Sequence, residues 1–460
     1  MTMSKVMIVS GDGHATPLVP TIAKYLDKEY RVHLDGLIRE DAAYIASAAT
    51  RARPPRLTLD LFDDRGLVRS GGEFGSVDAD IRVEQMDAEG ITAEIVHIGT
   101  QHAQIPFFGV TNGIWPDDVR AAGARAYHRW LAEFMAATGG RLFGVIEPGP
   151  CKDLDATIKE LEWCAANGFV AVSAPGYTAD PTLPELFDSY FEPFWTACEE
   201  LGLVISVHAG WGAPQTSMQE RQNQRASIMM EGDGETTGGH DFEIIHKLMQ
   251  EKGSPIRLSL QQPRRPMWKL MAGGVFDRHP NLKLALTEIR ADWVPATLEY
   301  LDQVFEDTKP GCELKPSAYF RQRCLVVPSS PHQSEIEMRH EIGIDQFGFG
   351  QDFPHWEGLW PNTLDWLRHA FHGVPESELR AILGANAVRF YGLPSTTLQQ
   401  VTDRIGPSVE DILGDHVVSE ELVQHFNKRA GYLRSADPVY SDEIDTMLRP
   451  DLAALSPAVV

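Results

Sequence analysis

The chain has 460 residues, of which 43% are hydrophobic, so it can bury a large core in one elaborated domain or in two ordinary ones. Its formal net charge of -24 is spread over the sequence without a basic patch, which argues against nucleic acid or an anionic membrane as a partner. No apolar run approaches the roughly 18 residues of a membrane span, and the run at 6–9 is too short for a signal-peptide core, so we expect a soluble, cytoplasmic protein.

Eight short apolar runs, punctuated by Gly, Pro or polar residues, predict buried strands. In chain order they are 6–10, 93–99, 142–146, 169–173, 203–207, 284–287, 324–327 and 347–351. Stretches with helical spacing lie between most of them, at 118–137, 154–167, 190–201 and 293–305. This alternation predicts an α/β fold, a (β/α)8 TIM barrel over residues 1–395.

Three segments fall outside the alternation. Residues 21–80 are an insertion after the first strand, which we expect to form a cap or loops over the barrel mouth. The polar stretch 211–241 follows the fifth strand and is either a mobile flap or a passive surface loop. Residues 396–460 form a tail or arm that packs on the barrel or on a neighbouring subunit.

The cysteines form an odd set of five without a C-x-x-C spacing, which argues against a disulfide framework and against a thiolate zinc site. We expect reduced and mostly buried thiols. They are Cys151, Cys164, Cys198, Cys312 and Cys324.

Four of the expected strands end in residues that commonly bind metals: Asp12-Gly13-His14, His208, Glu288 and Asp352. Because parallel barrel strands deliver their carboxyl ends to one face, these side chains can converge around an ion. Taken alone, Asp12-Gly13 is typical of a turn, with His14 as a capping or core histidine. His208 taken alone is typical of a hydrogen-bonded core residue. A buried carboxylate at Asp352 would be costly without a cation, and the four strand ends together favour a metal site.

Other residues near strand ends are candidates for catalysis or substrate binding, and each also has a structural interpretation. His355 can stabilise an oxyanion or cap the next helix. Arg290 can bind a substrate carboxylate or form a salt bridge, and Trp211 can contact an aromatic ring or pack in the core. His102, after the second strand beside Gln101, is a further candidate for substrate binding.

Several motifs together resemble the amidohydrolase-related family that includes aminocarboxymuconate semialdehyde decarboxylase. They are Gly11-Asp12-Gly13-His14, Ser206-Val207-His208-Ala209-Gly210, Gly273-Gly274-Val275-Phe276-Asp277-Arg278-His279-Pro280, Leu286-Thr287-Glu288, Gly350-Gln351-Asp352-Phe353-Pro354-His355 and Leu383-Gly384-Ala385-Asn386-Ala387. The resemblance extends over residues 5–395 and implies that Asp12, His14, His208 and Asp352 bind zinc or manganese. It also implies a possible homodimer.

Three departures from the family pattern bear on the chemistry. Asp12 stands where the family often has the first histidine of H-x-H, which shifts the preference toward harder ions such as manganese without excluding zinc. No lysine occurs between Lys159 and Lys247 to form a bridging carbamate, so we expect one divalent ion. Glu288 replaces a histidine of well-known decarboxylases and is a ligand, a general acid/base or a partner of Arg290.

The leading hypothesis from the sequence is a hydrolase that attacks an amide-like or other carbon–nitrogen bond of a small molecule with metal-activated water. A divalent ion lowers the pKa of bound water from ~15.7 toward ~7, and Asp352 would accept its proton and pass it on. The alternative is a decarboxylase (lyase) of an aromatic or unsaturated acid, with Glu288 or His355 as the proton donor. A third hypothesis is a non-catalytic binding protein on the same barrel. The insertion and Glu288 favour hydrolysis.

Overall fold

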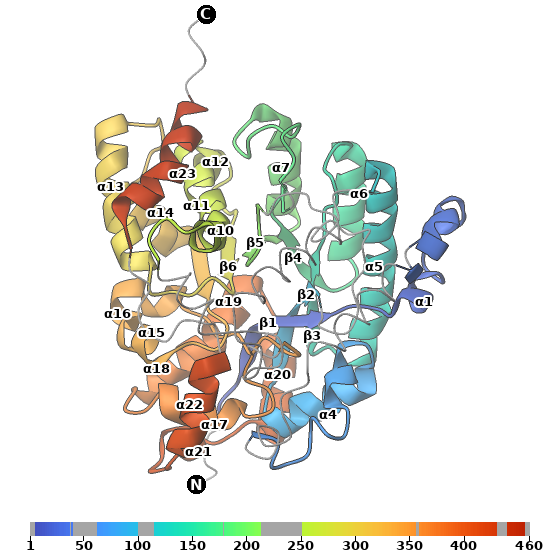
Figure 1. The fold of residues 1–460 in the computed structure, drawn as a ribbon, viewed down its shortest axis with the longest axis vertical. Helices are drawn as coiled ribbons and strands as arrows, with labels where there is room; N and C mark the ends of the chain where they lie inside the picture. Colours follow the sequence, from blue (N-terminus) through green and yellow to red (C-terminus); the bar gives the residue numbers. More distant parts are fainter. Residues whose placement is uncertain are drawn as a thin grey trace, which may run out of the picture.

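The computed structural model describes residues 5–36, 38–39, 62–99, 115–177, 179–212, 251–355, 358–429 and 439–455. Its centre is a parallel sheet with the strands in sequence order (Figure 1). The strands are β1 (Val9–Ala15), β2 (Ala93–Ile98), β3 (Leu142–Ile146), β4 (Phe169–Ser173), β5 (Val204–His208), β6 (Leu284–Thr287) and β7 (Cys324–Val327). Helices surround the sheet, as the predicted barrel requires.

The expected eighth strand is present only as isolated bridges. Phe347 bridges Val326 of β7, and Phe349 bridges Ser10 of β1, both in parallel, so this segment closes the sheet into a barrel. The ladder is interrupted because the amide of Gln351 donates to the side-chain oxygen of Ser10, at 2.8 Å, instead of to a backbone carbonyl. The prediction of a continuous strand at 347–351 is therefore wrong, whereas the position of the segment is right.

The first strand also differs from its prediction. The expected strand ended at Ser10, but β1 runs to Ala15, so Asp12 and His14 lie inside the strand. The His14 amide donates to the carbonyl of Phe353 at 2.7 Å, which extends β1 along the closing segment. A register irregularity between Ser10 and Gly13 is a β-bulge of the kind that redirects side chains beside active sites.

Helices predicted between the strands form at nearly the expected places. They are α5 (Asp117–Ala137), α6 (Leu154–Ala165), α7 (Glu192–Glu200) and α13 (Val294–Thr308). In Figure 1, α5, α6 and α7 stand side by side along the outside of the sheet. Two cores result, one inside the barrel and one between strands and helices. Residues of α19 (Asn386–Tyr391) and α20 (Ser395–Ile405), including Tyr391 and Leu398, join the inner core.

The tail packs on the barrel of its own chain. Helix α23 (Ser441–Ala453) lies against α11 (Arg265–Ala272) and α13, in the red and yellow-green part of Figure 1. Helix α22 (Glu420–Arg429) lies against α17 (Thr363–Ala370). The domain boundary at residue 395 and the role of residues 396–460 as an arm stay predictions.

The described end of the insertion lies against the segment that follows Asp352. Phe62 and Val68 form a small apolar cluster with Phe353 and Trp360. Residues 40–61 of the insertion and 213–241 of the expected flap lie outside the described residues. Among the described helices, none has both the length and the apolar composition of a membrane span. All five cysteines are free, and four of them are buried, as predicted.

Candidate active site

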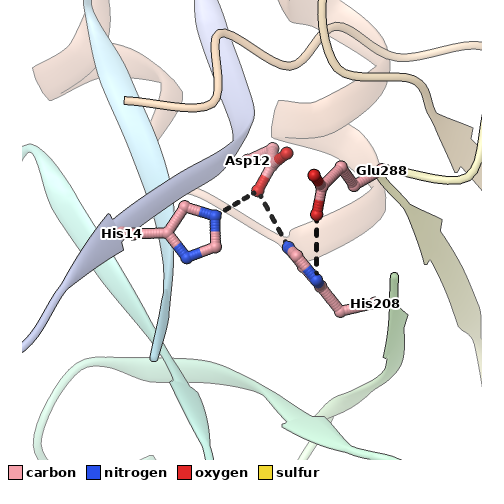
Figure 2. Close-up of side chains that lie close together, drawn as sticks. All are labelled: Asp12, His14, His208 and Glu288. Carbon is pink, nitrogen blue, oxygen red and sulfur yellow. Dashed lines mark hydrogen bonds and ion pairs between the residues drawn. The ribbon is translucent and has the colours of Figure 1, made fainter. Parts of the chain in front are cut away.

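The predicted strand-end residues converge in one cluster. Figure 2 shows Asp12 and His14 from β1, His208 from the end of β5 and Glu288 after β6 pointing toward one another. Asp12 Oδ1 lies 3.3 Å from His14 Nε2 and 3.2 Å from His208 Nε2. Glu288 Oε2 lies 3.3 Å from His208 Nδ1. Residues separated by up to 276 positions in the printed sequence, 288 minus 12, therefore share one site.

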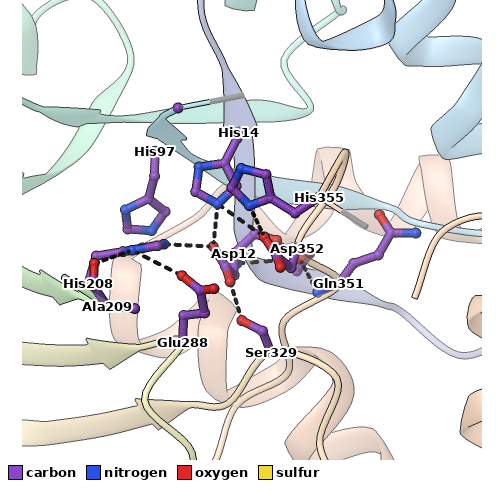
Figure 3. Close-up of polar contacts among 12 residues, drawn as sticks. Asp12, His14, His97, His208, Ala209, Glu288, Ser329, Gln351, Asp352 and His355 are labelled. Carbon is purple, nitrogen blue, oxygen red and sulfur yellow. Dashed lines mark hydrogen bonds and ion pairs between the residues drawn. The ribbon is translucent and has the colours of Figure 1, made fainter. Parts of the chain in front are cut away.

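Asp352 and His355 complete this cluster on the side of the closing segment (Figure 3). Asp352 Oδ1 lies 3.2 Å from His14 Nε2 and 2.7 Å from His355 Nδ1. The Asp352 amide donates to the carbonyl of Asp12 at 2.9 Å, so the two carboxylates are held in register by their backbones.

The backbone is unusual at three residues of this face. Glu288, Arg290 and Asp352 have φ angles of 58°, 59° and 62°, in the left-handed region that side-chain-bearing residues rarely adopt. Such conformations persist only when the surrounding structure imposes them, and they concentrate at functional sites. They explain how residues just beyond a strand turn back toward the barrel axis.

The cluster has the properties of a cation site. Asp12 and Asp352 are fully buried, and His14 is 1% exposed. His14 Nε2 is buried and lies within 3.3 Å of carboxylate oxygens of both Asp12 and Asp352 without an aligned hydrogen bond, and among the described residues the buried Asp352 Oδ2 has no hydrogen-bond partner. Leaving buried polar atoms unpaired is unfavourable, and a divalent ion would satisfy both. Two imidazoles with carboxylates form a nitrogen and oxygen donor set that suits zinc or manganese.

Electrostatics lead to the same conclusion. Burial would raise the pKa of Asp12, but the close polar contacts with His14 and His208 and their positive charge hold it well below the usual range. Burial would lower the pKa of His208, but the charge of Glu288 and the hydrogen bond with Asp12 raise it to about 9. Burial and the nearby charge of Asp352 raise the pKa of Glu288 well above its usual value. The site therefore attracts positive charge, from protons or from a metal ion.

Two neighbours of the cluster were missed by the sequence reasoning. His97, at the end of β2, is buried with its ring centroid 4.6 Å from that of His208. Burial and the charge of His208 hold the pKa of His97 well below its usual value, so this ring is neutral. Ser329 follows β7 and donates its hydroxyl to Asp12 Oδ2. A polar residue at a strand end, the signal that found His208, would also have found His97.

The substrate-binding candidates have other partners. Arg290 donates to Asp292 Oδ2 at 2.6 Å and lies 3.7 Å from Glu335, which is the salt bridge that the sequence left open. The buried indole of Trp211 donates to the carbonyl of Ala174 at 3.2 Å, as a core residue would. Contact of either residue with a substrate stays a prediction. Gln101 and His102 lie outside the described residues.

Comparisons with known proteins support this architecture. Residues 12–393 match the family model described as Amidohydrolase. Gamma-resorcylate decarboxylase of Rhodococcus jostii is 25% identical over 328 residues, which cover 68% of this chain and 87% of that protein.

Two solved structures share the fold. That of 2,6-dihydroxybenzoate decarboxylase complexed with 2,6-dihydroxybenzoate has a TM-score of 0.53 at 19% identity and covers 85% of this chain and 100% of that chain. That of 5-carboxyvanillate decarboxylase from Novosphingobium aromaticivorans, complexed with manganese and 4-hydroxy-3-methoxy-5-nitrobenzoic acid, has a TM-score of 0.53 at 16% identity, covering 84% of this chain and 96% of that chain. With its barrel and its family match over residues 12–393, this chain belongs to the amidohydrolase family.

Proposed function

We propose that this protein is a metal-dependent carboxy-lyase that removes the carboxylate of an aromatic acid as carbon dioxide. The observation that carries the proposal is the buried cluster in which His14 Nε2 faces the carboxylates of Asp12 and Asp352, and in which Asp352 Oδ2 has no hydrogen-bond partner among the described residues. The curated relatives are decarboxylases, and 87% of the length of the Rhodococcus protein is matched. This favours the decarboxylase alternative over hydrolysis of a carbon–nitrogen bond, which the sequence alone had favoured.

Asp12, His14, His208 and Asp352 would hold one divalent ion. Manganese is bound in the related 5-carboxyvanillate decarboxylase, and zinc suits the same donors. When bound, the ion supplies positive charge that attracts the substrate carboxylate and polarises a neighbouring oxygen. The second nitrogen of His208 lies 3.2 Å from the carbonyl oxygen of Ala209 and 3.3 Å from Glu288, contacts that fix the ring orientation as the outer partners of metal-bound histidines do.

Glu288 is the proposed proton donor. Its side chain is 19% exposed, whereas those of Asp12 and Asp352 are 0% and 1% exposed, so Glu288 is the carboxyl group that a substrate can reach. As the bond between the ring and the carboxylate breaks, its electron pair stays on the ring carbon and carbon dioxide leaves. The ring carbon then takes the proton of Glu288, which regains a proton from solvent. In this assignment Glu288 is an acid and not a metal ligand.

His355 has a supporting role in this proposal. Its Nδ1 lies 2.7 Å from Asp352 Oδ1, and its ring centroid lies 4.1 Å from that of His14. The ring therefore orients the Asp352 carboxylate in this proposal. The role of Asp352 as a general base belongs to the hydrolytic scheme and is not needed here.

The test is carbon dioxide release by protein stripped of metal and reloaded with manganese or zinc, using a panel of hydroxylated benzoates. We expect carbon dioxide and the decarboxylated ring in equal amounts, with one deuterium at the vacated carbon in heavy water. Glu288→Gln should keep its metal and lose about 10²–10⁴-fold in kcat, the usual contribution of a general acid. His208→Ala should lose the metal and the activity together.

Two outcomes would contradict the proposal. Hydrolysis of amides without carbon dioxide release from any acid would return the hydrolase hypothesis. Failure of the wild-type protein to retain any divalent ion, while it is folded, would make the cluster a structural network.

A further inference from the structure

A further carboxyl group, that of Glu147, lies at the C-terminal end of the barrel strands and is not one of the proposed ligands. Glu147 directly follows β3, in which Phe143 and Val145 face the inner core and Leu142 and Ile146 the outer one. Side chains alternate along a strand, so Glu147 continues the inward-facing set. Ser173, at the end of β4, follows inward-facing Ala171 in the same way. The register pairs Ser173 with Ser206, two residues before His208.

The Glu147 carboxyl has few polar partners. Ser173 Oγ donates to Glu147 Oε1 at 2.5 Å, and the two residues are 7% and 6% exposed. No ion pair of Glu147 is present among the described residues, unlike Glu94, which pairs with Arg82 at 2.7 Å. A buried carboxyl group without a cation partner favours its neutral form.

A chain of hydrogen bonds from the outer helices fixes the main chain at this position. The Glu147 amide donates to His128 Nε2 at 3.1 Å, and His128 Nδ1 lies 2.8 Å from Glu160 Oε1. Because Nε2 accepts, Nδ1 carries the proton in neutral His128 and donates to Glu160. Arg129 donates to both oxygens of Glu160, at 2.6 and 2.8 Å. This support resembles the outer hydrogen bonds that position functional groups.

The Glu147 carboxyl group changes its protonation state near pH 7. Burial raises its pKa to about 7, against the hydrogen bond from Ser173 and the positive charges of His208 and Arg120. Tyr127 of α5 and Cys151 also interact electrostatically with Glu147. Burial raises the pKa of Tyr127 well above its usual value and that of Cys151 to about 12, so both stay neutral near pH 7.

We propose that Glu147, in its protonated form, donates a hydrogen bond to an oxygen substituent of the bound aromatic acid and so contributes to substrate selection. A carboxylic acid can donate to a hydroxyl or anionic oxygen, whereas a carboxylate can only accept and would repel an anionic ligand. The substrate class is thus narrowed to aromatic acids with a further oxygen directed toward the β3 side of the barrel. This inference rests on the proposed function for the nature of the ligand.

The test is a calorimetric binding measurement on manganese-loaded protein. The ligands are two inert ring analogues that differ by one hydroxyl group. Neither analogue should titrate between pH 6 and pH 8. We expect the wild-type protein to bind the hydroxylated analogue about tenfold better at pH 6 than at pH 8, and the other analogue equally at both. Glu147→Gln keeps a hydrogen-bond donor that does not ionise, so the preference of this variant for the hydroxylated analogue should be independent of pH. Glu147→Leu should lose the preference.

Glu162→Leu, at an exposed position of α6, is the matched control and should behave as the wild-type protein does. Equal preference in the wild type and in Glu147→Leu, with metal content unchanged, would overturn the inference. Because binding is measured without turnover, loss of the preference in Glu147→Leu would support the inference even if no acid released carbon dioxide. The two proposals can therefore fail separately.

Discussion

At the scale of single residues, Gly13 separates two proposed ligands and lies against a buried ion pair. A Cβ at this position would lie 3.0 Å from Arg82 Nη2 and 3.4 Å from Glu94 Oε1. Arg82 cannot move aside easily, because it donates to Glu94 Oε2 at 2.7 Å and to the carbonyl of His14 at 2.9 Å. The ion pair thus holds the β-bulge that directs Asp12 and His14 into the site.

We therefore expect Gly13→Ala to weaken metal binding by about tenfold or more, since displaced outer partners commonly cost 10–100-fold in affinity. The measurement is competition with a metal-indicator dye, accompanied by circular dichroism to confirm that the fold is kept. Unchanged metal affinity of Gly13→Ala would show that the side chains of Arg82 and Glu94 can shift without moving the proposed ligands.

Glu160 offers a pH-dependent test at the same scale. Burial would raise its pKa, but hydrogen bonds from His128 and Arg129 lower it to about 2, from 4.5. A lowered pKa in the folded state gives stability that is complete above the unfolded pKa and is lost as the pH falls through the folded pKa. The contribution of Glu160 is therefore present at pH 7 and declines from about pH 4.5 toward pH 2.

Glu160→Gln should lower the free energy of unfolding by about 1–3 kcal/mol at pH 7, because His128 and Arg129 lose a charged acceptor. The difference from the wild type should shrink below pH 4.5. Urea denaturation at pH 7 and pH 3.5 measures it. A difference of the same size at both pH values would mean that packing, and not ionisation, accounts for the loss.

At the scale of secondary-structure elements, α23 is attached to the barrel by buried carboxylates. Asp451 accepts hydrogen bonds from Arg265 at 2.5 Å and from the Trp268 indole at 2.8 Å, and Lys269 Nζ lies 3.1 Å away. Glu443, near the N-terminal end of the same helix, accepts a hydrogen bond from Arg257 at 2.7 Å. These contacts join the tail to the helices around α11.

Asp451→Asn should destabilise the protein by about 2–4 kcal/mol, because it leaves the charges of Arg265 and Lys269 without their buried partner. Asp442→Asn is the control on the same helix. Its carboxylate is 67% exposed and pairs with exposed Lys252, so no measurable change is expected. Thermal unfolding of both variants measures the effect, and equal midpoints would show that α23 contributes little to the stability of the barrel.

The sequence predicts elements better than contacts, for physical reasons visible at particular residues. The strands β3, β4, β6 and β7 were predicted at their observed bounds because apolar runs between glycines or polar residues are a local signal. The attachment of α23 depends on residues 186 positions apart, such as Arg265 and Asp451, and has no local signal. The side chain of Ser10 that interrupts the eighth strand is likewise unpredictable without its neighbour Gln351.

At the scale of the whole molecule, barrel closure creates the candidate site. The segment at 347–353 joins β7 to β1, and its backbone bonds bring Asp352 beside Asp12. Convergence of the strand ends was predictable from the barrel alone. The role of each residue in the site was not predictable from the barrel. The partners of Glu288, Arg290 and His97 depend on left-handed turns and on ring contacts across the barrel.

Metal removal should therefore destabilise the entire barrel. An ion present at 100 to 1,000 times its dissociation constant stabilises the folded state by about 2.7–4.1 kcal/mol. We expect a chelator to lower the unfolding midpoint of the wild-type protein and to leave that of His208→Ala unchanged. No shift in the wild type would mean that the cluster binds no ion in the folded state.

This effect should grow with pH. In the metal-free protein the pKa of His208 is raised to about 9, from 6.5, by Glu288 and Asp12 despite burial. A raised folded-state pKa gives stability that is complete below the unfolded pKa and is lost as the pH rises through the folded value, so the metal-free cluster loses its compensating proton between pH 6.5 and about 9. A bound ion replaces that charge and competes with fewer protons at higher pH. The difference in unfolding midpoint between metal-loaded and chelated protein should therefore be larger at pH 9 than at pH 6.5, and a constant difference would exclude His208 from the metal site.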